Sequence, residues 1–220
     1  MRRLLIGVLQ GLAAAAIVGA TLFSCAWRLD IPQFWIYAGI IAATTVASVL
    51  LVDPSLYAER LRPGGQPLDP RYWLLNVLIA AHWVVAGLNV GRLHWSPPLP
   101  PVAWIVGNLV LAGGMALILW AMHVNRFFSS VVRIQTERGH VVVTQGPYAF
   151  IRHPGYAAGV VMAVASGFAL GSLWSVAVAL AALPLLYVRV IHEDRTLHDE
   201  LPGYADYAKR VRWRIIPGIW

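Results

Sequence analysis

Residues 153–188 read HPGYAAGVVMAVASGFALGSLWSVAVALAALPLLYV, and none of these 36 residues is Asp, Glu, Lys or Arg. A transmembrane helix needs about 20 apolar residues, so this stretch is too long for one span and suits two short ones. Gly171-Ser172 is a natural turn between them. The sequence therefore predicts a helical hairpin that returns both of its ends to the same side of a membrane.

The rest of the chain is similarly apolar. Hydrophobic residues make up 59% of the 220 residues and charged residues 12%, and the mean hydropathy is +0.65, which excludes an ordinary soluble domain. Four further uncharged runs cover residues 4–27, 31–52, 72–91 and 93–125. Because such runs are too long and too uniformly apolar for barrel strands, we predict an all-α, multi-pass membrane protein of about six transmembrane helices.

The basic residues indicate how these helices are oriented. With a cytoplasmic N-terminus, 15 of the 17 Lys and Arg residues lie inside and only Arg28 and Arg92 lie outside, as the positive-inside rule requires. We therefore expect both termini and both ends of the hairpin to be cytoplasmic. The net charge of +7 suits anionic lipid head groups. No nucleic-acid-binding motif is present, so the expected partner is the lipid bilayer and not a nucleic acid.

The two parts of the chain differ in the chemistry they offer. Residues 1–101 contain three spans and a polar cytoplasmic loop at 53–71, without a recognisable motif. Residues 102–220 contain the remaining features: helix 4, a cytoplasmic connector at 126–154, the hairpin at 155–192 and a cytoplasmic C-terminal segment. A connector of this length is usually a binding loop.

Local patterns within 102–220 predict two further features. The Val-rich segment His140–Thr144 favours β structure. The last helix should continue past the membrane to Glu200, because Leu201-Pro202-Gly203 breaks it, and a short amphipathic helix is expected within 204–211.

Polar side chains gather at both ends of the hairpin. Arg189 and Glu193 are four residues apart and share one helix face. They form either a surface ion pair or two ligand-binding groups, in which Glu193 binds a cation and Arg189 an anion. At the other end, Pro154 suits the first turn of a helix. The surrounding segment, Tyr148 to Tyr156, also places two tyrosines, an arginine and a histidine at the head of a span.

The sequence does not predict a metal site. Cys25 is the only cysteine, and His192 is not followed by a second histidine at position 196, which is threonine, so the His-Glu-x-x-His pattern is absent. Polar residues within the spans, such as His82, either line a substrate cavity or satisfy one another between helices. No Gly-x-Gly-x-x-Gly follows a predicted strand, which excludes a Rossmann-type cofactor site.

Residues 140–220 resemble the isoprenylcysteine carboxyl methyltransferase family of integral membrane enzymes, which use S-adenosylmethionine. The similar motifs are, in order, His140-Val-Val-Val-Thr-x-Gly-Pro-Tyr148, Arg152-His-Pro-x-Tyr156, the hairpin, Arg189-x-x-x-Glu193-Asp-x-x-Leu197, Gly203-Tyr-x-x-Tyr207 and Arg214-x-Ile-Pro217. Two departures stand out. Where eukaryotic members have glutamine this chain has Arg133, with Gln135 two residues on, and the familiar Glu-Glu pair is Glu193-Asp194.

The resemblance implies a set of site residues. It places Arg189 and Glu193 as catalytic residues, with Arg189 against the methyl acceptor. It implies that the cofactor is bound by His140, Val141, Val142, Val143, Tyr148, Arg152, His153, Pro154, Gly155, Tyr156 and Glu193. The chemistry of these side chains agrees: Glu193 complements a cation, and Arg152 or His153 could pair with the cofactor carboxylate. Tyr148 or Tyr156 could face the sulfonium by a cation–π contact.

The resemblance predicts an S-adenosylmethionine-dependent methyltransferase, most similar to protein-S-isoprenylcysteine carboxyl O-methyltransferases, that acts on a lipophilic small molecule or a prenylated substrate at the cytoplasmic face. Methyl transfer needs no covalent enzyme intermediate, so catalysis should rest on positioning and exclusion of water. Two alternatives stay open: a phospholipid amine or small-thiol methyltransferase of the same superfamily, and a non-enzymatic scaffold or transporter. A transporter more often pairs charges at mid-membrane, and no predicted span carries such a pair.

Overall fold

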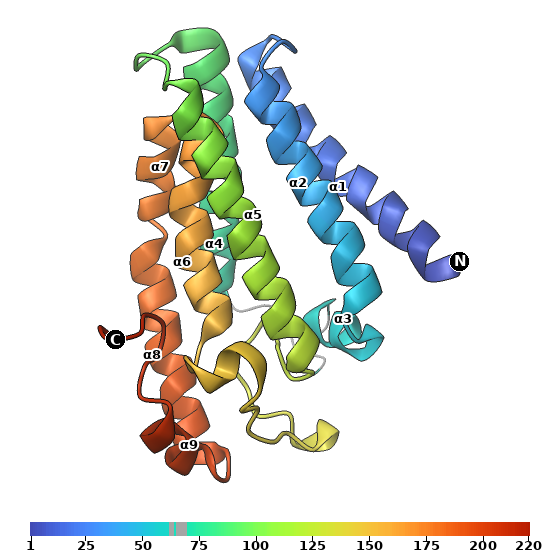
Figure 1. Ribbon diagram of the computed structural model, residues 1–220, viewed down its shortest axis with the longest axis vertical. Helices are drawn as coiled ribbons and strands as arrows, with labels where there is room; N and C mark the ends of the chain where they lie inside the picture. The colour runs from blue at the N-terminus through green and yellow to red at the C-terminus, as the bar shows by residue number, and fades with distance from the viewer. Residues whose placement is uncertain (62–63, 65–69) are drawn as a thin grey trace.

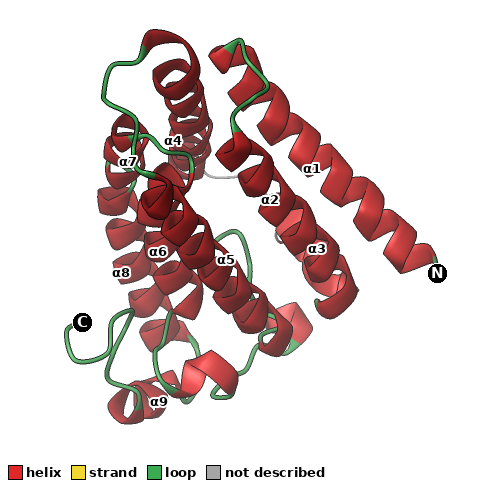
Figure 2. Cartoon of the chain, turned by 45° about the horizontal axis from the view of Figure 1, so that its top comes forward, coloured by secondary structure: helices red, strands yellow, loops and turns green. Residues whose placement is uncertain are grey.

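The computed structural model describes residues 1–61, 64 and 70–220, and this part of the chain contains helices and loops but no strand (Figures 1 and 2). The predicted all-α fold is confirmed. Most of the apolar surface of the long helices is exposed, as in α1, where Leu5, Leu9 and Leu12 are about 60% exposed. Such surface suits lipid contact. Residues 62–63 and 65–69 of the predicted loop at 53–71 lie outside the described residues.

Within the part of the chain that the structure describes, five helices are long and apolar enough to cross a membrane. They are α1 (Arg2–Ala26), α2 (Pro32–Leu51), Leu74–Leu93 from α4 (Pro70–Gly87) and the π-helix η2 (Leu88–Leu93), α5 (Pro101–Val124), and Leu173–Glu200 from α7 (Leu173–Leu180) and α8 (Leu183–Glu200). A further apolar helix, α6 (Pro154–Ala169), has 16 residues. At about 1.5 Å per residue it is shorter than the hydrocarbon core of a bilayer, so a count of six spans stays a prediction.

Two shorter helices, α3 (Pro54–Leu61) and α9 (Tyr204–Arg210), lie at one end of the bundle. The connector contains only the 3₁₀ turns η3 (Thr136–Arg138) and η4 (Gly146–Ala149). The Val-rich segment His140–Thr144 lies in coil, because the described chain offers it no partner strand. The expected break after Glu200 and the short helix that follows it are both present.

The chain reverses direction between α6 and α7 at Gly171 and Ser172. Gly171 has a φ of 78°, a left-handed conformation that glycine adopts without strain. Ser172 caps α7 by accepting a hydrogen bond from the Ser175 amide at 3.2 Å. A second interruption, at 181–182, separates α7 from α8. Pro184, in the first turn of α8, explains it, because proline cannot donate the hydrogen bond that would continue α7. The sequence-based prediction did not include this break.

Polar side chains inside the bundle bind one another across helices. His82 Nε2 lies 2.7 Å from Ser166 Oγ, and the Tyr37 hydroxyl lies 2.8 Å from the same oxygen. Trp83 Nε1 donates to the Tyr37 hydroxyl at 3.0 Å. These contacts join α2, α4 and α6 and favour the interpretation in which polar groups satisfy one another between helices.

The arrangement of the helices gathers the chemically rich segments at one end. α1 packs against α2, α4 and η2, while α5 packs against α2 and α6. In Figure 1 the connector at 126–154, α3 and α9 lie together at the lower end, opposite the turns that join α1 to α2 and α6 to α7. Segments far apart in the sequence therefore enclose one region.

Candidate functional site

A cavity of about 360 Å³ lies where the connector meets the ends of α4, α5, α6 and α8. This volume is in the range of small-molecule sites. One wall is apolar and includes Leu75, Ile118 and Leu186. Polar residues of the connector and of the ends of α6 and α8 also line the cavity. The cavity can therefore accept a ligand with both an apolar and a charged part.

The Tyr156 hydroxyl joins the two charged residues at this end of α8. It accepts a hydrogen bond from Arg189 Nε at 2.7 Å and donates one to Glu193 Oε2 at 2.6 Å. Arg189 also donates to the Ser130 carbonyl at 2.5 Å. The side chain of Glu193 is 29% exposed and lines the cavity. Arg189, Tyr156 and Glu193, which we call the relay, thus hold opposite charges on either side of one hydroxyl group.

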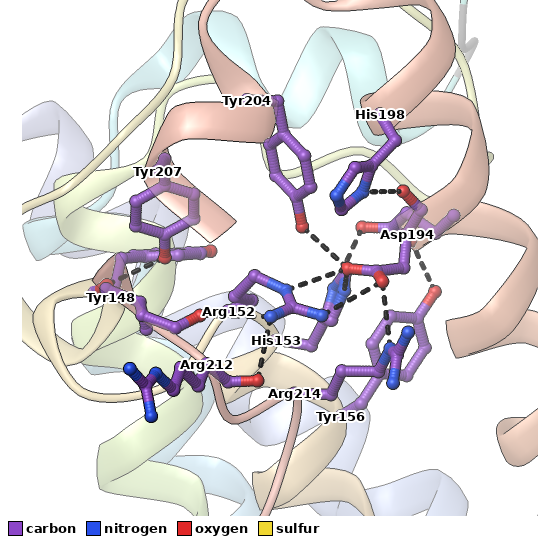
Figure 3. Close-up of polar contacts among 12 residues, drawn as sticks. Tyr148, Arg152, His153, Tyr156, Asp194, His198, Tyr204, Tyr207, Arg212 and Arg214 are labelled. Atoms are coloured by element: carbon purple, nitrogen blue, oxygen red, sulfur yellow. Dashed lines mark hydrogen bonds and ion pairs between the residues drawn. The ribbon is translucent and has the colours of Figure 1, made fainter. Parts of the chain in front are cut away.

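Asp194, the next residue, faces away from the cavity and is almost fully buried, with 4% of its side chain exposed. Arg152 donates to it through Nε at 2.9 Å and Nη2 at 3.0 Å, and Arg214 Nε donates at 2.8 Å. The Tyr204 hydroxyl and His153 Nε2 bind it at 2.9 and 3.0 Å. Figure 3 shows these side chains converging on the carboxylate. We call this group of five residues the clamp.

Arg152 uses four of its five N–H donors on protein acceptors. Besides the two bonds to Asp194, its Nη1 donates to the carbonyls of Val211 and Arg212 at 3.0 and 2.8 Å. His153 is held in the same way, with Nε2 on Asp194. Arg152 thus fixes the C-terminal segment against the start of α6. Pairing of Arg152 or His153 with the cofactor carboxylate stays a prediction, and both residues line the cavity.

Tyr148 is positioned by the connector and by α9. Its hydroxyl accepts a hydrogen bond from Asn125 Nδ2 at 2.9 Å, and its carbonyl accepts one from the Tyr207 hydroxyl at 2.7 Å. Burial raises the pKa of Tyr148, so the phenol stays protonated and neutral at physiological pH. An uncharged aromatic ring therefore faces the cavity.

His140 contributes a neutral ring to the connector wall. The centroid of its ring lies 4.5 Å from the centroid of the Phe127 ring, and the backbone amide of Gln135 donates to Nδ1 of His140 at 3.3 Å. Burial, together with the cations Arg133 and Arg138, lowers the pKa of His140 to about 4. The next residues, 141–143, line the cavity, and within the described chain their backbone groups make no hydrogen bond to protein. They are available to a ligand.

The upstream edge of the site is formed by Arg133. Its guanidinium binds both Glu59 oxygens at 3.0 and 2.8 Å and Glu137 at 2.6 Å, and it lines the cavity. Gln135 is buried, and Nε2 of its side chain donates to the Phe127 carbonyl at 2.7 Å. The glutamine therefore stabilises the connector instead of reaching the cavity.

The structure brings together nearly all the site residues predicted from the sequence. Lining the cavity are His140, Val141, Val142, Val143, Tyr148, Arg152, His153, Gly155, Tyr156, Arg189 and Glu193. Pro154 does not line it and is buried in the first turn of α6. Sequence reasoning missed Arg60 and Phe128, which also line the cavity, because nothing in a polar loop shows which of its residues will fold back onto a distant helix.

Gly155 is required by the packing of the cavity wall. A Cβ atom at this position would lie 2.5 Å from two ring carbons of Phe128. The α6 backbone and the aromatic ring can therefore approach only because residue 155 has no side chain. Among the described residues, no group of three or more His, Cys, Asp or Glu side chains is placed to hold a metal ion.

The comparisons with known proteins agree on the family. The family model described as "Isoprenylcysteine carboxyl methyltransferase (ICMT) family" matches residues 105–199. A solved structure, the eukaryotic intramembrane Ras methyltransferase ICMT, superposes with a TM-score of 0.60 at 21% identity, over 93% of this chain and 75% of that one. At this identity the likeness concerns the fold.

Three relatives carry two kinds of name. The cobalt-zinc-cadmium resistance protein CzcN of Cupriavidus metallidurans is 32% identical over 60% of this chain and 58% of its own length. The nickel-cobalt-cadmium resistance protein NccN of Alcaligenes xylosoxydans xylosoxydans is 30% identical over 69% and 70%. Protein-S-isoprenylcysteine O-methyltransferase B of Arabidopsis thaliana is 24% identical over 63% and 75%. With its apolar helices and this fold, the chain is a multi-pass membrane protein and belongs to the isoprenylcysteine carboxyl methyltransferase family.

Proposed function

We propose that this membrane methyltransferase uses S-adenosylmethionine to methylate a carboxylate on a lipophilic acceptor, such as a prenylated cysteine, at the cytoplasmic face. The observation that carries the proposal is the relay. It presents a cation and an anion, joined by one hydroxyl group, at a cavity that is also lined by apolar side chains. A donor with cationic groups and an acceptor with an anionic head and an apolar tail fit these two charges.

The residues present suit the cofactor. S-adenosylmethionine carries a sulfonium and an ammonium group, and the partly exposed Glu193 carboxylate is complementary to both. The neutral rings of Tyr148 and Tyr156 could face a sulfonium. The unpaired backbone groups of residues 141–143 could bind the polar edges of the adenosine part. Bound there, the cofactor would supply a methyl group on a positively charged sulfur.

The relay would orient the acceptor. Arg189 keeps a planar guanidinium in place through Tyr156 and Ser130, and such a group binds a carboxylate with defined geometry. A carboxylate is already deprotonated at neutral pH, so its oxygen could accept the methyl group without a general base. The C–O bond would form as the methyl–sulfur bond breaks, and the electron pair of that bond would stay on the sulfur as a neutral thioether. The apolar wall would exclude water, which otherwise solvates the acceptor oxygen.

Two variants test this division of roles. Glu193→Ala should abolish binding of S-adenosylmethionine to the purified protein in detergent, as measured by calorimetry. Glu200→Ala removes an exposed acid from the same helix and should leave binding unchanged. Arg189→Ala should bind the cofactor normally but lose turnover. Normal cofactor affinity in Glu193→Ala, or retained turnover in Arg189→Ala, would refute the assignment.

The acceptor class is tested by turnover of the wild-type protein. Labelled S-adenosylmethionine is offered with a prenylcysteine, an aminophospholipid or a small thiol. We expect transfer to the prenylcysteine carboxylate, detected as a base-labile methyl ester. Transfer only to the amine or the thiol would support another methyltransferase of the superfamily and overturn the carboxylate assignment.

A further inference from the structure

Arg60, in the last turn of α3, brings a second cation to the cavity from the N-terminal part of the chain. Its guanidinium carbon lies 5.3 Å from the centroid of the Phe128 ring, and Phe128 lines the same cavity. The position is half-buried. The ring holds the guanidinium at the wall by a cation–π contact.

Ser130 links Arg60 to Arg189. The Ser130 hydroxyl donates to the Arg60 carbonyl at 3.0 Å, while the Ser130 carbonyl accepts from Arg189 Nη2 at 2.5 Å. One residue of the connector therefore holds α3 and α8 together. The two arginines come from segments 129 positions apart and lie at one wall of the cavity.

The cavity-lining arginines differ in their partners. Arg133 binds Glu59 and Glu137, and Arg152 binds Asp194. Arg60 makes no ion pair or guanidinium hydrogen bond with any residue that the structure describes. Burial and the nearby charge of Arg189 lower its pKa. A half-buried cation in this situation is costly unless an anion approaches it.

We propose that Arg60 binds the anionic head group of the acceptor together with Arg189, and that it sets a preference for anionic over neutral acceptors. The inference rests on the proposed function, in which Arg189 faces the acceptor. The apolar tail would lie along Leu75, Ile118 and Leu186, which line the wall formed by α4, α5 and α8. Carboxylate and phosphate share the required chemistry, because both accept hydrogen bonds from a guanidinium fork.

The test compares three amphiphiles with the same tail: N-acetyl-S-farnesylcysteine, its uncharged carboxamide, and farnesyl phosphate. Their affinities are measured by competition on the full chain in detergent. The wild-type protein should bind the carboxylate at least tenfold more tightly than the carboxamide. Arg60→Gln should lose most of this preference, and Arg60→Lys should retain part of it because the charge remains. The phosphate shows whether the site accepts both anions.

Arg126→Gln is the matched control. The guanidinium carbon of Arg126 lies 4.8 Å from the centroid of the Phe127 ring. Arg126 is exposed and does not itself line the cavity, so its loss removes the same charge and a similar ring contact without removing a guanidinium from the cavity lining. Arg126→Gln should keep the wild-type preference. Thermal unfolding of all variants monitors the fold, and Arg60→Lys provides a second reading if Arg60→Gln is unstable.

The outcomes separate this inference from the proposed function. Suppose that the wild-type protein methylates the carboxylate and that Arg60→Gln prefers the carboxylate over the carboxamide as strongly as the wild type does. The Arg60 inference is then wrong and the proposed function stands. Equal wild-type affinity for the carboxylate and the carboxamide also overturns the inference. If the wild-type protein binds no S-adenosylmethionine, the proposed function fails. Cofactor affinity should be the same in Arg60→Gln and in the wild type.

Discussion

Glu193 and Asp194 are consecutive carboxylates on α8, yet they belong to regions with opposite properties. Asp194 is 4% exposed and is bound by Arg152, His153 and Arg214, among others. Glu193 is 29% exposed and accepts one hydrogen bond, from Tyr156, at the cavity. A helix separates successive side chains by about 100°, so one residue points into the packed interior and its neighbour toward a ligand. A carboxylate whose hydrogen-bonding capacity is taken up by protein donors stabilises the structure around a site, whereas one that is only partly bound can also bind a ligand.

The clamp supports the relay directly. The amides of Arg152 and His153 donate to the carbonyls of Trp213 and Arg214 at 2.9 and 2.8 Å, so the C-terminal segment runs beside the start of α6. This start carries Tyr156, whose hydroxyl joins the two charges of the relay. His153 touches both regions, because its Nδ1 lies 3.8 Å from Glu193 Oε1. The clamp therefore fixes the geometry on which the relay depends.

The largest effect should come from breaking the clamp. Asp194→Ala leaves the guanidinium groups of Arg152 and Arg214 without their counter-ion in a buried environment. Removing one partner of a buried ion pair costs about 3–5 kcal/mol. We expect a large fall in the midpoint of thermal unfolding in detergent. Glu193→Gln, a change to the neighbouring carboxylate, should lower it far less, and equal losses in the two variants would contradict the distinction between the two regions.

The contrast also shows what could be predicted from the sequence. The four-residue spacing predicted that Arg189 and Glu193 share a face, and the motif order placed Tyr148, His153 and Tyr156 at the same site. The physical reason is that helix periodicity and motif order are local properties. Run lengths of apolar residues likewise predicted the membrane helices.

Other features depend on pairings between distant segments. The sequence shows Asp194 only as a departure from a Glu-Glu motif, because its partner Arg214 lies in a segment whose path back to α6 has no local signal. Arg60 was counted only as a positive charge on the cytoplasmic side, and its contact with Phe128 spans 68 positions. Tertiary packing decides such contacts, and single residues give no spacing from which to infer them.

An intermediate effect should follow from cutting the relay without disturbing the clamp. Tyr156→Phe removes the hydroxyl that accepts from Arg189 and donates to Glu193, while the ring remains. A misplacement of about 1 Å can cost on the order of a hundredfold in rate, so we expect kcat to fall by roughly tenfold to hundredfold. The unfolding midpoint should fall by less than in Asp194→Ala.

Tyr187→Phe is the matched control for this experiment. Tyr187 also lies on α8, is 55% exposed and stacks on Trp220 with a centroid distance of 5.0 Å. We expect wild-type kcat in Tyr187→Phe. If Tyr156→Phe also turned over at the wild-type rate with the wild-type KM, the hydroxyl would have no part in aligning the two charges.

The smallest effect should be the pH dependence due to His140 in the connector. Its pKa is lowered from 6.5 to about 4 in the folded protein, so between these values the unfolded chain binds more protons than the folded one. Stability should therefore fall as the pH drops from about 6.5 to about 4, and this contribution should be constant above 6.5. Because the ring is half-exposed, solvent screening keeps the effect below those of the two changes above.

His140→Asn should flatten this dependence. Asparagine can still accept the Gln135 amide hydrogen bond but does not titrate, so the unfolding midpoint should decrease less between pH 7 and pH 5 than in the wild type. His192→Asn removes an exposed histidine from α8 and controls for the loss of a histidine as such. Identical slopes in His140→Asn and the wild type would mean that His140 is protonated as readily in the folded protein as in the unfolded chain. The connector, which already brings Arg133 to the cavity, would then add a second positive charge in mild acid.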